Sequence, residues 1–182
     1  MIYSETTSVT RRCFFAAAGL GLAASSASAN ESEAATANLP QAELLSGGEV
    51  KTYLLVFRTG QEVMKGLEAF ARKYKLQTGH LTGIGAISDA VIGYFDPEKK
   101  SYLRLHETGQ HEVLSVTGNL AQYDSAPFFH IHVALGLRDG QTRGGHLFEM
   151  TVHPTVELIL TTYPKVVARK IDPETGLPLL NP

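Results

Sequence analysis

The sequence predicts a compact single domain of the α+β class, with a mainly antiparallel β-sheet and one principal amphipathic helix after the first strand. Three observations carry this prediction: an apolar run at residues 50–57, a stretch of helical period directly after it, and then a series of runs rich in β-forming residues separated by turn residues. The length of 182 residues suits a single domain with its own core.

The first strand and the helix are expected between residues 50 and 74. Residues 50–57, VKTYLLVF, are almost continuously apolar, which is typical of a strand buried on both faces. Thr59 and Glu62 have the spacing of a capping box, so a helix should begin there. Apolar residues then recur at helical spacing and predict the buried face of this helix: Val63, Met64, Leu67, Phe70, Ala71 and Tyr74.

The rest of the domain is expected to be β-structure. Strands are predicted at residues 78–86, 88–96, 102–107, 113–123 and 156–163, together with a hairpin at 128–150. Gly83 and Gly85 are interpreted as sites of tight backbone packing, with ligand contact as the weaker alternative. Arg58 ends the first strand, where a surface salt bridge is the simpler role and an anionic ligand the alternative.

The hairpin at residues 128–150, FFHIHVALGLRDGQTRGGHLFEM, carries the most concentrated chemistry. Alternation places His130 and His132 on one face of its first arm, opposite an apolar stripe. The turn decides where His146 lies, because a shift of one residue reverses the face. A two-residue turn at Asp139-Gly140 sends His146 to the opposite face, whereas a three-residue loop pairs His132 with His146.

Three converging imidazoles would make a metal site. Two histidines on one strand and a third on its neighbour supply three ligands from a rigid support and leave the fourth position open, as in catalytic rather than structural sites. Nitrogen ligands without thiolate suit zinc, with iron, nickel and copper as alternatives. The competing interpretation is that His130 and His132 line a polar face or a subunit interface. A bulge at Gly144-Gly145 would change the register.

Residues 1–29 have the layout of a secretory signal peptide. Arg11 and Arg12 precede a short apolar run that ends in small residues. This run is shorter than the roughly 20 residues of a membrane-spanning helix. The paired arginines favour the twin-arginine type over an ordinary Sec signal. We expect cleavage after Ala29 and a periplasmic or otherwise exported chain.

Processing and composition restrict the possible functions. Cys13 is the only cysteine and would leave with the signal, which removes disulfides, thiolate ligands and thiol nucleophiles. The net charge of the whole chain is −2, so it lacks the basic footprint of a nucleic-acid binder. The expected organisation is a linker at 30–48, the domain at 49–164, and a tail at 165–182 that docks on the domain or on a neighbouring subunit, a disordered end being the alternative.

Four blocks in this order resemble the PPC domain family (plants and prokaryotes conserved): YLLVFRTGQEV, TGHLTGIGAISDAVIGYFD, EVLSVTGNLA and HIHVALGLRDGQTRGGHL. The resemblance covers roughly residues 50–163 and implies a compact fold with a largely antiparallel sheet that assembles as a homotrimer. It also implies a metal at His130, His132 and His146, as in some prokaryotic members. Plant members carry DNA-binding AT-hooks, but this chain has no Arg-Gly-Arg-Pro and no basic arm, so it resembles an exported bacterial member without them.

Three functions are compatible with the sequence. The first is an exported homotrimer that binds a divalent metal, with zinc preferred, and a small molecule; if it is an enzyme, a metal-dependent hydrolase or lyase is expected. The second is a non-catalytic binding or assembly module. The third is a DNA-associated protein, against which the signal peptide and the acidic balance both count. The sequence does not select a substrate or a catalytic residue.

Overall fold

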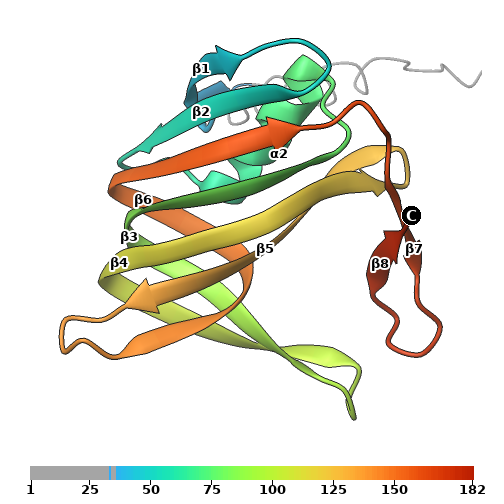
Figure 1. The fold of residues 1–182 in the computed structure, drawn as a ribbon. Coiled ribbons are helices and arrows are strands. Elements are labelled where there is room, and N and C mark those ends of the chain that lie inside the picture. Colours follow the sequence, from blue (N-terminus) through green and yellow to red (C-terminus); the bar gives the residue numbers. More distant parts are fainter. Residues whose placement is uncertain (1–32, 34–35) are drawn as a thin grey trace, which may run out of the picture.

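The computed structural model describes residue 33 and residues 36–182. The expected signal peptide, residues 1–29, lies outside the described residues. The elements are β1 (Gln41–Ser46), β2 (Lys51–Arg58), α2 (Val63–Tyr74), β3 (Gly79–Asp96), β4 (Ser101–Tyr123), β5 (Ala126–Gly136), β6 (Thr142–Thr162), β7 (Ala168–Ile171) and β8 (Pro178–Asn181). This is the expected α+β class, with one principal helix on a mostly antiparallel sheet (Figure 1).

The strands form a curled sheet in which part of the order closes on itself. The order runs β1-β2-β6-β3-β4, and β5 pairs with both β4 and β6. Strands β3, β4, β5 and β6 therefore surround a common interior, while β1 and β2 extend the sheet beyond β6 (Figure 1). The histidine hairpin, β5–β6, is the point at which this ring closes.

Three strands are much longer than the sequence indicated. Strand β3 covers both runs expected at 78–86 and 88–96, and β4 likewise joins 102–107 to 113–123. Strand β6 runs without a break from the second arm of the hairpin to Thr162. Between β3 and β4 the register shifts at Gly83/Gly85 and at Ile87/Asp89, so these strands bend at irregularities where the sequence pattern suggested an end.

A strand also occupies part of the segment expected to be a linker. Strand β1 lies within residues 30–48 and pairs antiparallel with β2, Ala42 opposite Leu55. All six of its residues are exposed. Because neither face of β1 is buried, its sequence shows none of the apolar alternation from which strands are recognised.

Helix α2 begins at a different cap from the one expected. Glu62, not Thr59, is the N-cap residue, and its carboxylate accepts hydrogen bonds from the backbone N–H groups of Met64 at 3.0 Å and Lys65 at 2.7 Å. The Thr59 hydroxyl instead donates to the carbonyl of Pro154. The same Glu62 carboxylate also accepts from the N–H of Met150 on β6, so it fixes the helix start to the sheet.

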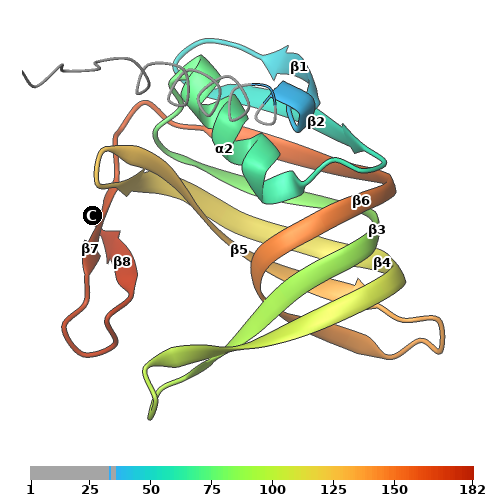
Figure 2. The ribbon, with the colours of Figure 1, turned by 180° about the vertical axis from the view of Figure 1, so that it is seen from behind.

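The core lies between α2 and the sheet and continues into the ring of strands. The helix covers one face of the sheet (Figure 2) and buries four apolar side chains there: Val63, Leu67, Phe70 and Ala71. Gly66 faces the ring of Phe57 and the carbonyl of Asn38 so closely that a Cβ would collide with both. No helix within residues 33 and 36–182 is long and apolar enough to span a membrane.

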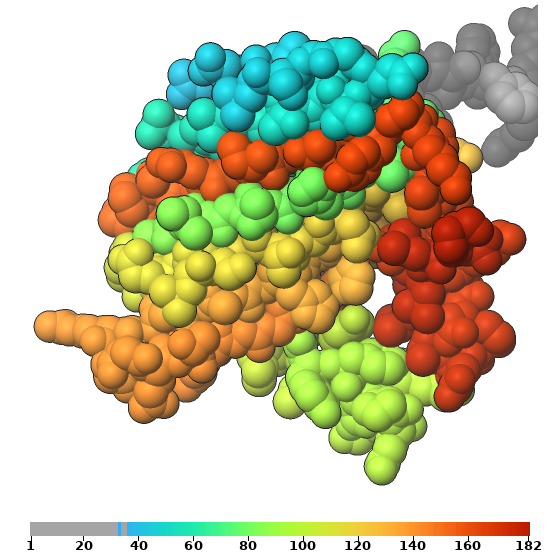
Figure 3. Space-filling model, viewed as in Figure 1, coloured from blue at the N-terminus to red at the C-terminus, as the bar shows by residue number. Residues whose placement is uncertain are grey.

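Two of the projections from this body lie beside each other. The turn end of the β3–β4 hairpin forms an arm, and β7 with β8 forms a short hairpin beside it (Figure 3). The C-terminal hairpin is attached to the sheet at the end of β4, where Ala168 pairs with Gln122 and the carbonyl of Val167 accepts from the Gln122 N–H. Most of the segment expected as a tail, 165–182, thus lies in this hairpin and contacts the end of β4.

Candidate metal centre

The loop between β5 and β6 sets the register of the histidines. Leu137 donates to the carbonyl of Gln141 at 2.8 Å, and Gly140 donates to the carbonyl of Leu137 at 2.9 Å. Gly140 has a φ of 81°, the left-handed conformation that glycine adopts at little cost. This is the three-residue loop of the two alternatives, and it places His132 directly opposite His146.

The three imidazoles converge. The Nε2 atoms of His130 and His132 lie 3.2 Å apart, and one ring nitrogen from each of the three histidines fits within 4.8 Å of the others. Metal–nitrogen bonds of about 2.0–2.1 Å in a tetrahedron set nitrogen–nitrogen separations of about 3.4 Å. The His130–His132 pair already has about this spacing, and the nitrogen of His146 lies within 4.8 Å of both.

Gly144 and Gly145 permit close strand packing and do not form a bulge in the β5–β6 ladder. The pairing runs without a shift from His132 opposite His146 to Gly136 opposite Thr142. A Cβ on Gly144 would lie 2.5 Å from the carbonyl oxygen of Val133, and one on Gly145 would lie 2.5 Å from that of Gly93. Glycine at both positions lets β6 approach its neighbours and brings His146 to the other two histidines.

The surroundings keep two of the imidazoles neutral. Burial is the main cause that lowers the pKa of His146 to about 4, and the charges of its neighbours add to it. Burial, followed by the positive charge of Arg169, also lowers the pKa of His130. Neutral imidazole is the form that coordinates a metal, so these rings are ready to bind at neutral pH.

The donor set fits a metal ion. The buried Nδ1 of His146 has no hydrogen-bond partner among the described residues, which costs free energy that a bound cation would recover. In the described part of the chain, no carboxylate forms a salt bridge with any of the three histidines. His130, His132 and His146 would thus hold the ion as neutral ligands and leave its charge uncompensated.

Two cavities meet at the histidines. A shallow one of about 270 Å³ is lined by His130 and His132 with Thr117, Gly118 and Asn119 of β4. The second, of about 260 Å³, is mostly apolar and lies on the side of His130 and His146. It also involves both projections of the fold, and its other lining residues are Tyr102, Phe128, Phe148, Arg169, Leu177, Pro178 and Leu179.

Several of these lining residues were not found by sequence reasoning. Phe148 follows His146 by two positions on β6, so strand alternation could have placed both on one face. The Tyr102 ring centroid lies 4.9 Å from that of His146, but Tyr102 comes from a distant strand. Arg169 belongs to the C-terminal hairpin, and nothing in its sequence context indicated a position beside the histidines.

The weaker candidates lie elsewhere. Gly83 and Gly85 are on β3 where it packs against β6, and a Cβ on either would collide with a backbone carbonyl of that strand, at Glu157 and Thr155. The Arg58 guanidinium reaches the amide oxygen of Gln41 at 3.4 Å. None of the three lines either cavity at the histidines.

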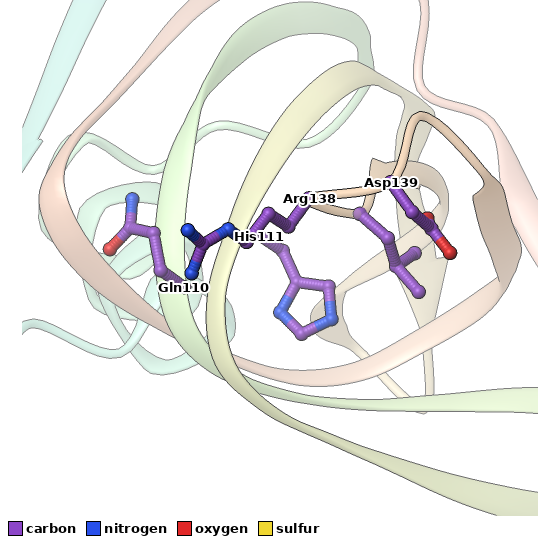
Figure 4. Close-up of a pocket in the computed structure, with 5 residues that line it drawn as sticks. Gln110, His111, Arg138 and Asp139 are labelled. Carbon is purple, nitrogen blue, oxygen red and sulfur yellow. The ribbon is translucent and has the colours of Figure 1, made fainter.

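Another cavity, of about 580 Å³, lies away from the three histidines of the hairpin and is open to solvent. It lies between residues 110–111 of β4 and the turn after β5, with Arg138 and Asp139 on its rim (Figure 4). Also on β4, the buried carboxylate of Glu107 accepts two hydrogen bonds from Arg143 at 2.9 and 3.2 Å. This ion pair satisfies the buried charge, and we interpret it as structural.

Comparison with known proteins identifies the family. The sequence model of the Plants and Prokaryotes Conserved (PCC) domain matches residues 44–164, which is more than half of the chain. The chain belongs to the PCC domain family, the same plants and prokaryotes conserved family that is abbreviated PPC above. The resemblance seen in the sequence is therefore confirmed, and the match includes all three histidines of the hairpin.

Solved structures of similar proteins share the PCC fold. A metal-containing protein from Archaeoglobus fulgidus is 35% identical, with a TM-score of 0.68 over 79% of this chain and 99% of that one. A plant- and prokaryote-conserved protein from Pyrococcus horikoshii is 34% identical, with a TM-score of 0.69 over 78% and 95%. A candidate DNA-binding protein from Bacteroides thetaiotaomicron is 25% identical, with a TM-score of 0.71 over 77% and 96%.

Among curated proteins, the chain is similar to part of a longer one. It is 32% identical over 138 residues to the bifunctional protein GlmU of a Synechococcus strain, which corresponds to 71% of this chain. The chain spans only about a fifth of the length of that relative, 20%. This likeness therefore concerns the PCC domain and does not transfer the activities of the longer protein.

Proposed function

We propose that this PCC protein is an exported domain that holds one divalent metal ion at His130, His132 and His146 and binds a small molecule beside it. The observation that carries the proposal is the convergence of three imidazoles from two paired strands. The metal-containing relative from Archaeoglobus fulgidus supports it. Zinc suits the site best, because the ligands are neutral nitrogens in an open arrangement.

The metal would bring Lewis-acid chemistry, the basis of hydrolase or lyase activity if the protein is an enzyme. The chain itself contributes a rigid pair of strands that fixes the three ligands, and two cavities through which a small molecule can approach. Among the described residues, no carboxylate lines either cavity as a partner for proton transfer. Binding is therefore the better supported half of the proposal, and a non-catalytic module remains its alternative.

Metal analysis tests the site directly. Protein purified without a histidine tag should contain one metal ion per chain by elemental analysis, and His130→Ala with His132→Ala should abolish it. His106→Ala is the matched control, because His106 is exposed on β4 and, among the described residues, belongs to no cluster of candidate metal ligands. Stoichiometric metal in the double variant, or none in the wild type, would refute the proposed site.

Self-association and export complete the proposal. The family resemblance implies a homotrimer, and three exposed apolar side chains on the β3–β4 arm offer a surface for it: Tyr94, Leu103 and Leu105. Export rests on the signal-like layout of residues 1–29. Mass spectrometry of protein from a bacterial periplasm should find the chain beginning at Asn30, and an intact N-terminus there would contradict cleavage after Ala29.

A DNA-associated role is the alternative that the description of the Bacteroides relative raises. The net charge of −2 argues against it, because DNA binding depends on Lys and Arg contacts to phosphates. A DNA-binding titration at two salt concentrations distinguishes the two functions. Tight, salt-dependent binding at physiological ionic strength would overturn the proposal.

A further inference from the structure

Arg169 is a buried cation without an anionic partner. The residue is only 6% exposed, and among the described residues it takes part in no salt bridge. Its Nη1 donates to the carbonyl of Pro178 at 2.8 Å and its Nη2 donates to the Oδ1 of Asn119, both neutral acceptors. The buried Nε has no partner at all in the described structure. A buried, uncompensated charge is costly, and residues of this kind gather at binding sites.

This cation lies in the wall of the apolar cavity beside the histidines. Arg169 lines that cavity with His130 and His146, and its guanidinium carbon lies 5.1 Å from the centroid of the Phe128 ring. A second guanidinium, of Arg104, stacks on the cavity residue Phe148 at 3.9 Å. The described residues that line the cavity include no Asp or Glu. The electrostatic environment therefore favours a negatively charged occupant.

The proposed metal site strengthens the same preference. Three neutral imidazoles do not reduce the charge of a divalent ion, so an anion at its open position and near Arg169 would be attracted by both positive charges and would partly offset them. The remaining wall is apolar and aromatic, with Tyr102, Phe148 and Leu179 among its residues. An occupant thus needs a charged head and an apolar body, and the volume of about 260 Å³ limits it to a small molecule.

We propose that this cavity binds a small organic acid whose carboxylate lies between Arg169 and the metal position and whose apolar body packs on Phe148 and the C-terminal hairpin. The inference rests on the proposed function in that the metal supplies one of the two positive charges. A carboxylate is favoured over a phosphate, because phosphate sites usually present several backbone N–H groups from a glycine-rich loop or a helix N-terminus. The cavity lining contains neither.

The test compares acids with neutral molecules of the same shape. Binding of benzoate and hexanoate, and of benzyl alcohol and hexanol, is measured by calorimetry on zinc-loaded and on metal-free protein. At least one acid should bind about ten- to a hundredfold more tightly than its neutral counterpart, the range expected for hydrogen bonds to a charged group. Equal affinity of each acid and its counterpart, or tighter binding of phenyl phosphate than of both acids, would overturn the inference.

Two substitutions test whether the bound carboxylate contacts Arg169. Arg169→Gln should weaken the acid about tenfold or more, whereas Lys170→Gln, which removes the adjacent exposed charge, should not. Zinc content of Arg169→Gln should stay at the wild-type level. If Arg169→Gln does not fold, the site is located by the NMR chemical-shift changes that the acid causes in the wild-type protein. These changes should centre on Phe128, Phe148 and Leu179, and changes centred elsewhere would refute the site.

The two proposals fail separately. Wild-type protein that contains no metal but still binds the acid through Arg169 refutes the metal site and supports the acid site. Wild-type protein that contains zinc but shows no preference for the acids, or none that depends on Arg169, supports the metal site and refutes the acid site.

Discussion

At the scale of single residues, the behaviour of His146 follows from where its ring lies. The ring is packed between Tyr102 and Phe148, with centroids 4.9 and 4.8 Å away. Such an environment penalises the charged form, which is why its pKa falls to about 4 from the ordinary value near 6.5. The same burial that prevents protonation makes the ring a ligand that stays available in mild acid.

This gives a prediction for the metal-free protein. Between pH 6.5 and about pH 4 the unfolded chain binds a proton at His146 and the folded chain does not, so the free energy of unfolding should decrease as the pH falls through this window. Imidazole NMR should show His146 titrating near pH 4. A midpoint near 6.5 would show that the ring is not desolvated.

Glu62 illustrates a residue whose role the sequence only half revealed. Spacing indicated a capping box with Thr59, but the carboxylate is itself the cap and also holds the N–H of Met150 at 3.0 Å. That third contact joins positions 88 apart in sequence, so no local pattern contains it. The helix start was therefore predictable to within a few residues, and the anchoring of that start to β6 was not.

Substitution of Glu62 should consequently destabilise the fold. Glu62→Ala removes three charge-assisted hydrogen bonds and should lower the free energy of unfolding by about 2 kcal/mol or more, measured by urea denaturation. Glu68→Ala is the control, because its ion pair with Arg72 is exposed and should contribute less than about 0.5 kcal/mol. Equal effects of the two substitutions would contradict the capping role.

At the scale of elements, the hairpin was the part of the site that could be worked out from sequence. Strand alternation placed His130 beside His132, and the loop alternatives reduced the position of His146 to a choice between two registers. The structure selects the three-residue loop. Arg169 and Tyr102 could not be found in this way, because they reach the site through the packing of distant strands, which periodicity does not encode.

The register can be tested by shortening the loop. Deleting Arg138 leaves Asp139-Gly140 as a two-residue turn with Leu137 still opposite Gln141, so His132 should remain opposite His146. The number of metal ions per chain should be unchanged. The affinity for the metal should stay within about threefold of wild type, which is a small change in binding free energy. Loss of the metal on this deletion would show that the loop controls more than register.

At the scale of the whole molecule, the site exists because the sheet closes on itself. Strand β5 must pair with both β4 and β6 for the histidines, the Tyr102 arm and the C-terminal hairpin to surround one cavity. The long, bent strands make this closure possible, and they are the elements that the sequence divided into shorter ones. The sequence thus predicted the class of the fold correctly, whereas the register shifts within the long strands, which local patterns do not reveal, were not predicted.

The β3–β4 arm has a different chemistry on its two faces. Tyr102 turns toward the cavity, whereas Tyr94 and Leu103 lie opposite each other on the ladder and are 67% and 59% exposed. Leu105, two residues further along β4, is 39% exposed. Apolar side chains that cluster on a projecting hairpin are typical of a contact with another chain.

Self-association should therefore depend on this arm. We expect sedimentation analysis to give the mass of three wild-type chains, and we expect Tyr94→Glu with Leu103→Glu to yield monomers, because a charge buried in an interface without a partner is strongly unfavourable. Leu44→Glu is the matched control, since Leu44 is exposed to a similar extent, 52%, but lies on β1. Trimers that persist in the double variant would place the interface elsewhere, and a monomeric wild type would remove the assembly from the proposal.

Because Tyr102 is on the same arm as the substituted residues, the zinc content and the acid affinity of the monomeric variant would also show whether the site is complete within one chain.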